Sequence, residues 1–229
     1  LQHVFLKILK FLEEPKMQNN FKNLSDQLFK LLDKNDTLTL SISGEKSHFC
    51  RFNQSKVRQI GDVVDTNLSL SIINNNRICH GGITLCNDSE VNMKKASVEL
   101  NRLKQEVHQL PEDPFLVMPS KYDSLIEINS GKLLESKDVV QSLVPIIEDV
   151  DLSGIWASGN IYRGCSNSLG LFHWFETETY SFDFSMVTKD ERMVKGTFSG
   201  TEWNQDKYEN YMNKSKEKLV LLNRDSVKI

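Results

Sequence analysis

The sequence contains few residues whose types and spacing could support chemistry. Cys79, His80 and Cys86 lie close together along the chain and are of the types that bind zinc. On a strand, however, the adjacent Cys79 and His80 point to opposite faces, and the gap to Cys86 fits no common zinc spacing. The pattern therefore favours a buried Cys79 beside an exposed His80 rather than a metal site.

The histidines and acidic residues give only weak signals. The five histidines form neither a His-x-x-x-His pair nor the His-Glu-x-x-His motif of helical zinc sites. Glu176 and Glu178 share one face of a predicted strand and could act as a carboxylate pair, although a solvated strand edge is the favoured interpretation. A hydrolase with a site built from His48, His80 and Glu176 stays open as an alternative.

The most distinctive polar residues lie in two turns, 52–55 and 166–170. Asn and Ser side chains bond to nearby backbone, so a role in setting the turn geometry is the favoured interpretation. The functional alternative is a groove for an extended peptide that pairs with a neighbouring strand. The residues that would bind this peptide are Asn53, Ser55, Asn167 and Ser168.

These turns belong to a pattern that occurs twice. An offset of 114 residues carries Asn53 onto Asn167, and it carries Leu68 and Leu70 onto Phe182 and Phe184. After one inserted residue in the following hairpin, Arg77 and Gly81 fall on Arg192 and Gly196 at an offset of 115. Apolar residues of the first copy thus correspond to apolar residues of the second. Because a slip of one residue would move every core side chain to the other face of its strand, the match indicates an internal duplication.

Each copy predicts a helix, an antiparallel meander and a second helix, which makes an α+β fold of two tandem repeats with sheets flanked by helices. In the first copy, helices are expected from Asn20 to about Leu32 and from Asp88 to Val107. A tight hairpin is expected at 74–76. Five strands are predicted between the helices, at 37–43, 48–52, 56–62, 66–73 and 77–85. The second copy predicts helices at 134–150 and 204–222, with strands at 152–158, 161–166, 171–176, 179–187 and 193–201.

The predicted domains are an N-terminal amphipathic appendage (1–18), the first repeat (19–109), a linker (110–133) and the second repeat (134–229). Lysines interleaved with apolar residues before Pro15 predict a short helix in the appendage. Pro111, Pro114 and Pro119 mark the linker. A chain that ends at Ile229, directly after a repeat, is what one domain of a longer protein would look like.

Composition narrows the class of protein. The net charge is −3 and there is no basic block, so nucleic acid is not an expected partner. No apolar run approaches the length that spans a bilayer, so no membrane association is expected. Four cysteines without tight spacing predict a reduced, cytoplasmic protein.

Four segments, taken in order, carry a family resemblance. They are Arg51–Gln59, Asn76–Gly81, Gly154–Gly159 and, with the best match, Cys165–Leu171. In this order, and with the internal duplication, the chain resembles the N-terminal half of the TldD/PmbA family, once called modulators of DNA gyrase. The resemblance covers residues 20–223.

The resemblance implies the scaffold, dimerisation and peptide-channel half of a zinc metallopeptidase complex that acts on unfolded or leader peptides. Its implied partners are a peptide substrate and either a second copy or a TldD/PmbA-like paralogue. The family's metal motif, a helical His-Glu-x-x-x-His with a later Cys, belongs to the C-terminal half, and no residue here matches it. Zinc is therefore expected only in that half or in a paralogous partner, and this chain is not expected to be catalytic alone. The alternative is a stand-alone module that binds peptide or protein by strand addition.

Overall fold

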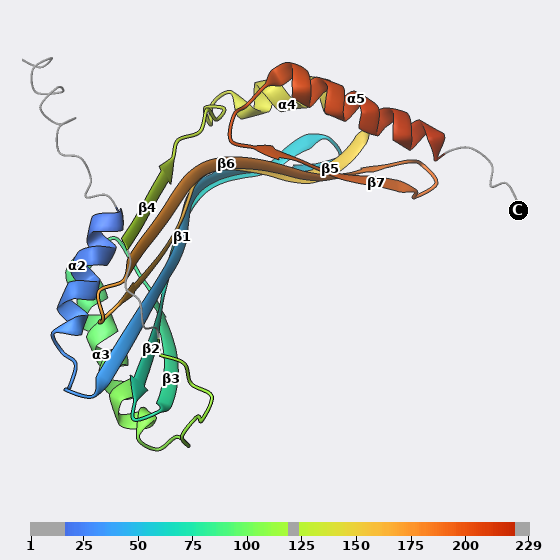
Figure 1. Ribbon diagram of the computed structural model, residues 1–229. Coiled ribbons are helices and arrows are strands. Elements are labelled where there is room, and N and C mark those ends of the chain that lie inside the picture. The colour runs from blue at the N-terminus through green and yellow to red at the C-terminus, as the bar shows by residue number, and fades with distance from the viewer. Residues whose placement is uncertain (1–16, 119–123, 223–229) are drawn as a thin grey trace, which may run out of the picture. The chain divides into compact units, whose positions relative to one another are not determined.

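The computed structural model describes residues 17–118 and 124–222 of the chain (Figure 1). The helix predicted before Pro15 lies outside these residues. The chain divides into two compact units. Unit 1 contains the residues up to Gly44, Thr66–Glu127 and Tyr162–Phe175. Unit 2 contains Glu45–Asp65, Ile128–Ile161 and the residues from Glu176 onward. Each unit is therefore built from parts of both sequence repeats.

The described residues form an α+β fold, as predicted. The helices are α2 (Met17–Phe29), α3 (Ser89–Val107), α4 (Val139–Ile147) and α5 (Gln205–Leu221). The strands are β1 (Asp36–Asn53), β2 (Lys56–Asn74), β3 (Arg77–Thr84), β4 (Ser124–Asn129), β5 (Asp151–Asn167), β6 (Phe172–Val187) and β7 (Met193–Gly200). Hydrogen-bonded neighbours follow the order β3-β2-β1-β5-β6-β4, and β7 also pairs with β6.

The prediction of five strands in each repeat was wrong, because each repeat has three strands and two of these are long. In β1, buried side chains stay on even-numbered residues throughout, but Leu38 and Leu40 belong to the core of unit 1, whereas Cys50 and Phe52 belong to that of unit 2. The polar stretch between these two pairs of residues lies where β1 passes from the core of unit 1 to the core of unit 2. The sequence interpretation predicted two separate strands, 37–43 and 48–52, on either side of this stretch.

Two further boundaries differ from the prediction. The segment 110–133, predicted as a linker, contains β4, and all six residues of this strand are exposed. The predicted helix at 134–150 is shorter, because α4 spans only Val139–Ile147 and contains Pro145. Pro145 lies inside α4, although proline has no backbone N–H to donate to the helix.

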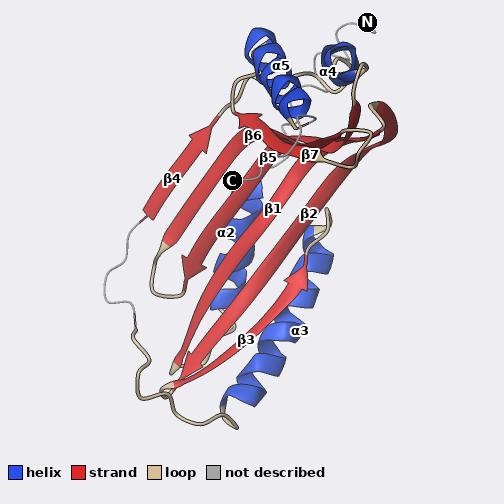
Figure 2. Ribbon diagram, turned by 90° about the vertical axis from the view of Figure 1, so that its right-hand side faces the viewer, coloured by secondary structure: helices blue, strands red, loops and turns tan. Residues whose placement is uncertain are grey.

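In unit 1, α2 and α3 lie against one face of the sheet (Figure 2). Helix α3 starts where predicted, because the Asp88 side chain accepts hydrogen bonds from the backbone N–H groups of Glu90 and Val91. Apolar side chains at three- and four-residue spacing face the strands, and the ring of Tyr162 stacks on that of Trp174 with centroids 5.5 Å apart. The buried helix side chains are Phe21, Leu24, Leu28, Ala96, Leu100, Leu103 and Val107.

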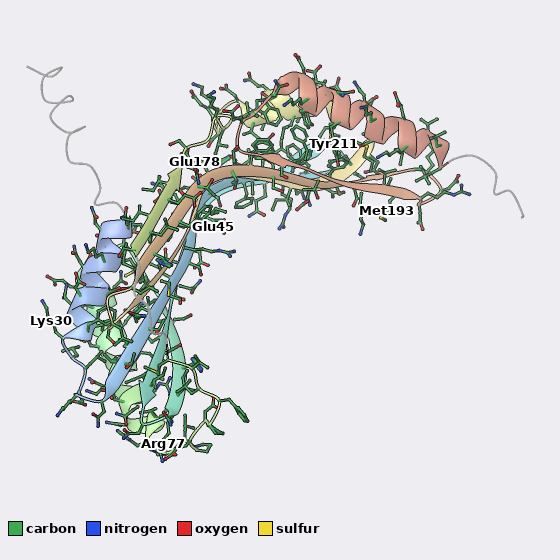
Figure 3. All side chains as sticks on the ribbon, viewed as in Figure 1. Lys30, Glu45, Arg77, Glu178, Met193 and Tyr211 are labelled. Atoms are coloured by element: carbon green, nitrogen blue, oxygen red, sulfur yellow. The ribbon has the colours of Figure 1, made fainter. Side chains whose placement is uncertain are left out.

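Unit 2 is built in the same way from α4 and α5 over its own part of the sheet. Figure 3 shows Tyr211 of α5 among the aromatic side chains between this helix and the strands. Tyr208 is fully buried, and its hydroxyl donates to the carbonyl of Leu143, 3.1 Å away, which ties α5 to α4. Trp156 of β5 stacks on Tyr180 with centroids 5.1 Å apart.

The two repeats pair their strands in the same register. Leu70 lies opposite Gly81 in the β2–β3 hairpin, and Phe184 lies opposite Gly196 in the β6–β7 hairpin. These pairs are related by the offsets found in the sequence. The β2–β3 turn is tight, as predicted, because Asn75 and Asn76 have φ angles of 47° and 57°.

Candidate functional site

Each of the two predicted polar turns forms hydrogen bonds to the first residues of a strand in the other repeat. In unit 2, the backbone N–H of Ser55 donates to the carbonyl of Leu152 at 2.8 Å, and the Leu152 N–H donates to Ser55 Oγ at 3.1 Å. In unit 1, Ser168 and Leu38 make the same pair of bonds, at 2.9 and 3.1 Å. The same geometry thus occurs at both turns.

The two asparagines also bond within the protein. Asn167 is buried, and its side-chain oxygen accepts from the N–H groups of Leu169 and Leu171, both at 3.0 Å. Asn53 accepts from the Ser153 hydroxyl at 3.0 Å. Asn53 and Ser55 lie in unit 2, whereas Asn167 and Ser168 lie in unit 1. Peptide binding by these four residues stays a prediction, and what the geometry shows directly is their role in the turns.

Cys79 and His80 differ in burial as their opposite faces on the strand predicted. Cys79 is buried, and burial, with the neighbouring Glu106 carboxylate, raises the pKa of its thiol. His80 is exposed and lies 2.8 Å from the hydroxyl of Ser71. Within residues 17–118 and 124–222, no group of three or more His, Cys, Asp or Glu side chains is placed to hold a metal ion.

The three residues of the alternative hydrolase site each have a local partner. His48 Nδ1 lies 2.9 Å from Asp62 Oδ1, and Glu176 accepts from the Asn160 side chain at 2.6 Å. These two lie in unit 2, and His80 lies in unit 1. The contact between His80 and the Ser71 hydroxyl joins a potential base to a potential nucleophile, but it lies in unit 1, whereas His48 and Glu176 lie in unit 2.

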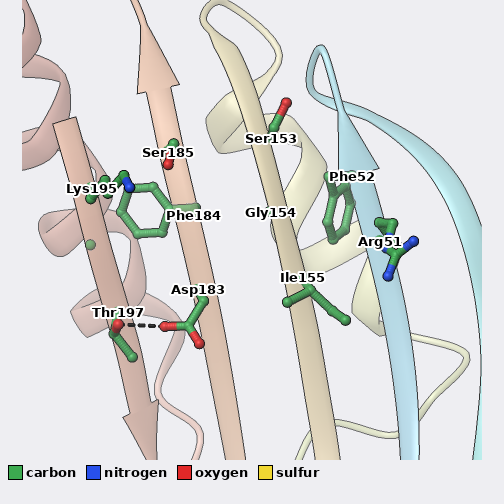
Figure 4. Close-up of a pocket in the computed structure, with 11 residues that line it drawn as sticks. Arg51, Phe52, Ser153, Gly154, Ile155, Asp183, Phe184, Ser185, Lys195 and Thr197 are labelled. Carbon is green, nitrogen blue, oxygen red and sulfur yellow. Dashed lines mark hydrogen bonds between the residues drawn. The ribbon is translucent and has the colours of Figure 1, made fainter. Parts of the chain in front are cut away.

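A shallow hollow of about 720 Å³ lies on the sheet of unit 2 (Figure 4). It is lined by β1, β5, β6 and β7, and the exposed side chains around it include Arg51, Ile155, Asp183 and Lys195. The Asp183 carboxylate accepts a hydrogen bond from Thr197. Two cations and an apolar side chain on an open sheet surface suit carboxylate or carbonyl groups of an extended polypeptide. No pattern in the sequence predicted this hollow, because its residues are far apart along the chain.

A second candidate surface is the edge of β2 in unit 2. Strand β3 pairs only with Asn67–Asn74, so among the described residues no strand covers Lys56–Val64 on the side away from β1. Figure 2 shows β3 ending partway along β2. Apolar side chains are exposed along this edge, with Val57 at 37%, Ile60 at 50% and Val64 at 57%.

The fold and these surfaces define a helix–meander–helix scaffold with open sheet surfaces and no metal-binding group in its described part. No protein-family profile matches the sequence, and no curated protein matches it. The described part of the chain has no helix with the length and hydropathy needed to cross a membrane.

Solved structures with a similar fold do exist. A proposed modulator of a DNA gyrase from Thermotoga maritima matches with a TM-score of 0.63 and 14% identity, over 91% of this chain and 50% of its own. TldE from Thermococcus kodakarensis matches with a TM-score of 0.65 and 14% identity, over 88% and 47%. A proposed modulator of DNA gyrase from Bacteroides thetaiotaomicron matches with a TM-score of 0.62 and 17% identity, over 90% and 51%.

This chain therefore has the fold of part of TldE and of the proposed gyrase modulators, and it spans about half their length. The resemblance predicted from the four sequence segments is confirmed at the level of the fold.

Proposed function

We propose that this chain is the N-terminal half of a TldD/PmbA-like protein, and that it forms the scaffold and peptide-binding part of a zinc metallopeptidase complex. The observation that carries the proposal is the fold match, which covers about nine-tenths of this chain but only about half of each solved protein. The lack of a metal-binding group in the described residues supports a division of labour in which zinc and peptide cleavage belong to a C-terminal half or a paralogous partner.

The proposed substrates are unfolded or leader peptides, handled in the cytoplasm. The hollow in unit 2 supports this substrate class, because Arg51 and Lys195 offer positive charge beside an open sheet surface. All four cysteines are free thiols, as suits a reducing compartment.

The test combines the purified chain with a metal-bearing TldD-type paralogue and unfolded peptides. Alone, the chain should contain no stoichiometric zinc and cleave nothing, whereas the complex should cleave the peptides. Arg51→Ala and Lys195→Ala should raise the KM of the complex while leaving its zinc content unchanged. Lys95→Ala, at an exposed position on α3, is the matched control. Zinc binding and peptide turnover by the chain alone would refute the proposal.

A stand-alone module that binds polypeptide by strand addition is the second candidate. The open edge of β2 favours it, because a row of unpaired backbone groups is a template for another strand. Isothermal titration with unfolded peptides separates the two functions. Equal affinity with and without the paralogue, together with no cleavage in either case, would favour the module.

A further inference from the structure

The hollow in unit 2 presents charges in a pattern that defines the peptide it fits. We propose that it selects extended peptides in which two acidic residues flank a lysine at every second position, that is, acidic–x–lysine–x–acidic. This selectivity deepens the proposed function, on which it rests, because it names the class of substrate that the same hollow takes.

The register between β1 and β5 places Ile155 opposite Arg51. Near the end of β1, the Asn53 side chain accepts a hydrogen bond from Ser153, near the start of β5, at 3.0 Å. Further along β5, a Cβ on Gly159 would lie 2.2 Å from a carbonyl oxygen in an earlier part of β1, so the two strands run antiparallel. Two residues inward from the first pair, Ile155 and Arg51 therefore lie side by side.

The register between β5 and β6 brings Asp183 beside Ile155. A Cβ on Gly154 would lie 3.0 Å from the Cβ of Phe184, so these two residues lie opposite each other. Because the short turn that joins β5 to β6 makes the strands antiparallel, the next residue of β5, Ile155, lies opposite the preceding residue of β6, Asp183. Both are exposed, on the sheet face away from the buried Phe184.

Lys195 lies at the far side of the hollow, on β7. Asp183 pairs with Thr197, and Lys195 is two residues before Thr197 on the same face of β7. Three interstrand spacings of about 4.8 Å and one two-residue step of about 6.8 Å separate the Cα atoms of Arg51 and Lys195, which makes about 16 Å. Figure 4 shows Ile155 and Asp183 between the two cations.

Across the sheet, the exposed groups are a cation, an apolar side chain, a carboxylate and a second cation, on Arg51, Ile155, Asp183 and Lys195. The Asp183 carboxylate accepts a hydrogen bond from Thr197 through Oδ1, and Oδ2 is left to face a ligand. The charge sequence is therefore positive, negative, positive, and its complement is negative, positive, negative.

An extended peptide carries side chains at a matching spacing. Its residues i, i+2 and i+4 point to one face, and the outer two lie about 14 Å apart. The flexible side chains of Arg51 and Lys195 lean inward to bind the two outer carboxylates by charge-assisted hydrogen bonds. A middle lysine packs its methylene stem on Ile155 and places its ammonium group at Asp183. A middle glutamate would instead be repelled by Asp183. Because the pattern reads the same from both ends, it fits either direction of the peptide.

Fluorescence anisotropy with the 229-residue chain alone tests this selectivity. Three peptides with blocked ends and a neutral dye are compared, namely Glu-Ser-Lys-Ser-Glu, Ser-Glu-Lys-Glu-Ser and Lys-Ser-Glu-Ser-Lys. The second has the composition of the first at the wrong spacing, and the third reverses its charges. Exposed ion pairs are individually weak, so the first peptide should bind about fivefold tighter than the second and at least about tenfold tighter than the third. Its affinity should fall as the salt concentration rises.

Two variants test the residue roles. Arg51→Glu should bind Lys-Ser-Lys-Ser-Glu at least about threefold tighter than Glu-Ser-Lys-Ser-Glu, which inverts the wild-type preference. Wild type should prefer Glu-Ser-Lys-Ser-Glu to Glu-Ser-Gln-Ser-Glu by about threefold, and Asp183→Asn should bind these two peptides equally. Lys95→Glu, on exposed α3, is the matched charge control and should keep every wild-type preference. Circular dichroism checks that each variant is folded.

Equal binding of the two peptides that differ only in spacing would overturn the selectivity. So would no binding of Glu-Ser-Lys-Ser-Glu up to the solubility limit of the chain, or a folded Arg51→Glu variant with the wild-type preference. None of these results touches the proposed function, which is tested by peptide cleavage in the complex with a metal-bearing paralogue. A chain that binds with this selectivity, in a complex that cleaves no peptide, would refute the proposed function and leave the selectivity in place.

Discussion

Removing the two serine hydroxyls at the turns should destabilise the protein, and by unequal amounts. Ser55 is buried, and its hydroxyl donates to the Val150 carbonyl and accepts from the Leu152 N–H. Ser168 is only half-buried, and its hydroxyl accepts from the Leu38 N–H. A buried donor left without a partner costs about 1–3 kcal/mol, and the lost carbonyl bond adds about 1 kcal/mol. We therefore expect Ser55→Ala to cost about 2–4 kcal/mol and Ser168→Ala about 1–3 kcal/mol.

Urea unfolding followed by circular dichroism gives the two free energies, provided that the m-value stays constant. Hydrogen exchange gives a local readout. The Leu152 amide should exchange at least about tenfold faster in Ser55→Ala, and the Leu38 amide should do so in Ser168→Ala. The control is Ser69→Ala, an exposed serine in β2, which should stay within about 0.5 kcal/mol of wild type.

The reasoning fails if Ser55→Ala changes the free energy of unfolding no more than Ser69→Ala does. It also fails if exchange at Leu152 is unaltered, because the hydroxyl would then not be the group that satisfies this donor. An equal loss in both turn variants would contradict the difference in burial and bonding but leave the turn geometry intact.

Three further predictions follow from single residues. Gly159→Ala should lower the free energy of unfolding in urea by about 3 kcal/mol, because Gly159 has a φ of 155° and a Cβ there would lie 2.2 Å from a carbonyl oxygen of β1. The control is Gly82→Ala, whose Cβ would meet nothing nearer than 3.4 Å and which should lower that free energy by about 1 kcal/mol or less. Asn167→Ala should cost about 1–3 kcal/mol because two backbone N–H groups lose their acceptor, whereas Asn167→Asp keeps an acceptor and should cost less; equal losses would contradict this. Burial raises the pKa of Cys50 from 9.0 to about 11, so a thiol reagent at pH 8 should modify exposed Cys86 but reach Cys50 only on unfolding. Because the unfolded state loses its Cys50 proton first, stability should fall as pH rises from 9 towards 11, and it should fall less in Cys50→Ala.

Local patterns in the sequence predicted the elements that depend on near neighbours. Asp88 caps α3 and Asn204 caps α5, at the residues where the two helices were predicted to begin, because a capping side chain bonds backbone two or three residues ahead. The Asn75–Asn76 turn follows equally from the tolerance of asparagine for positive φ. The repeat offsets of the sequence carry the pair Leu70–Gly81 onto the pair Phe184–Gly196, and the structure pairs both in this way.

The hollow in unit 2 could not be predicted, because Arg51, Ile155, Asp183 and Lys195 come from four strands that only the sheet brings together. The open edge of β2 is visible only once the pairing is known, since a strand sequence does not state where its neighbour stops. Strand β4 was missed for a related reason, because its side chains are exposed and leave no alternating pattern.

The sequence by itself determined the repeat of the pattern, the face that each strand buries and the chemistry of the turns, because all of these depend on a period of two or on residues a few positions apart. Only the tertiary structure decided which core each half of a long strand enters. It also decided that the turn of one repeat bonds the first strand of the other, across 97 positions between Ser55 and Leu152. A strand's alternation specifies a face but no partner, and the partner is chosen by packing and pairing over the whole chain.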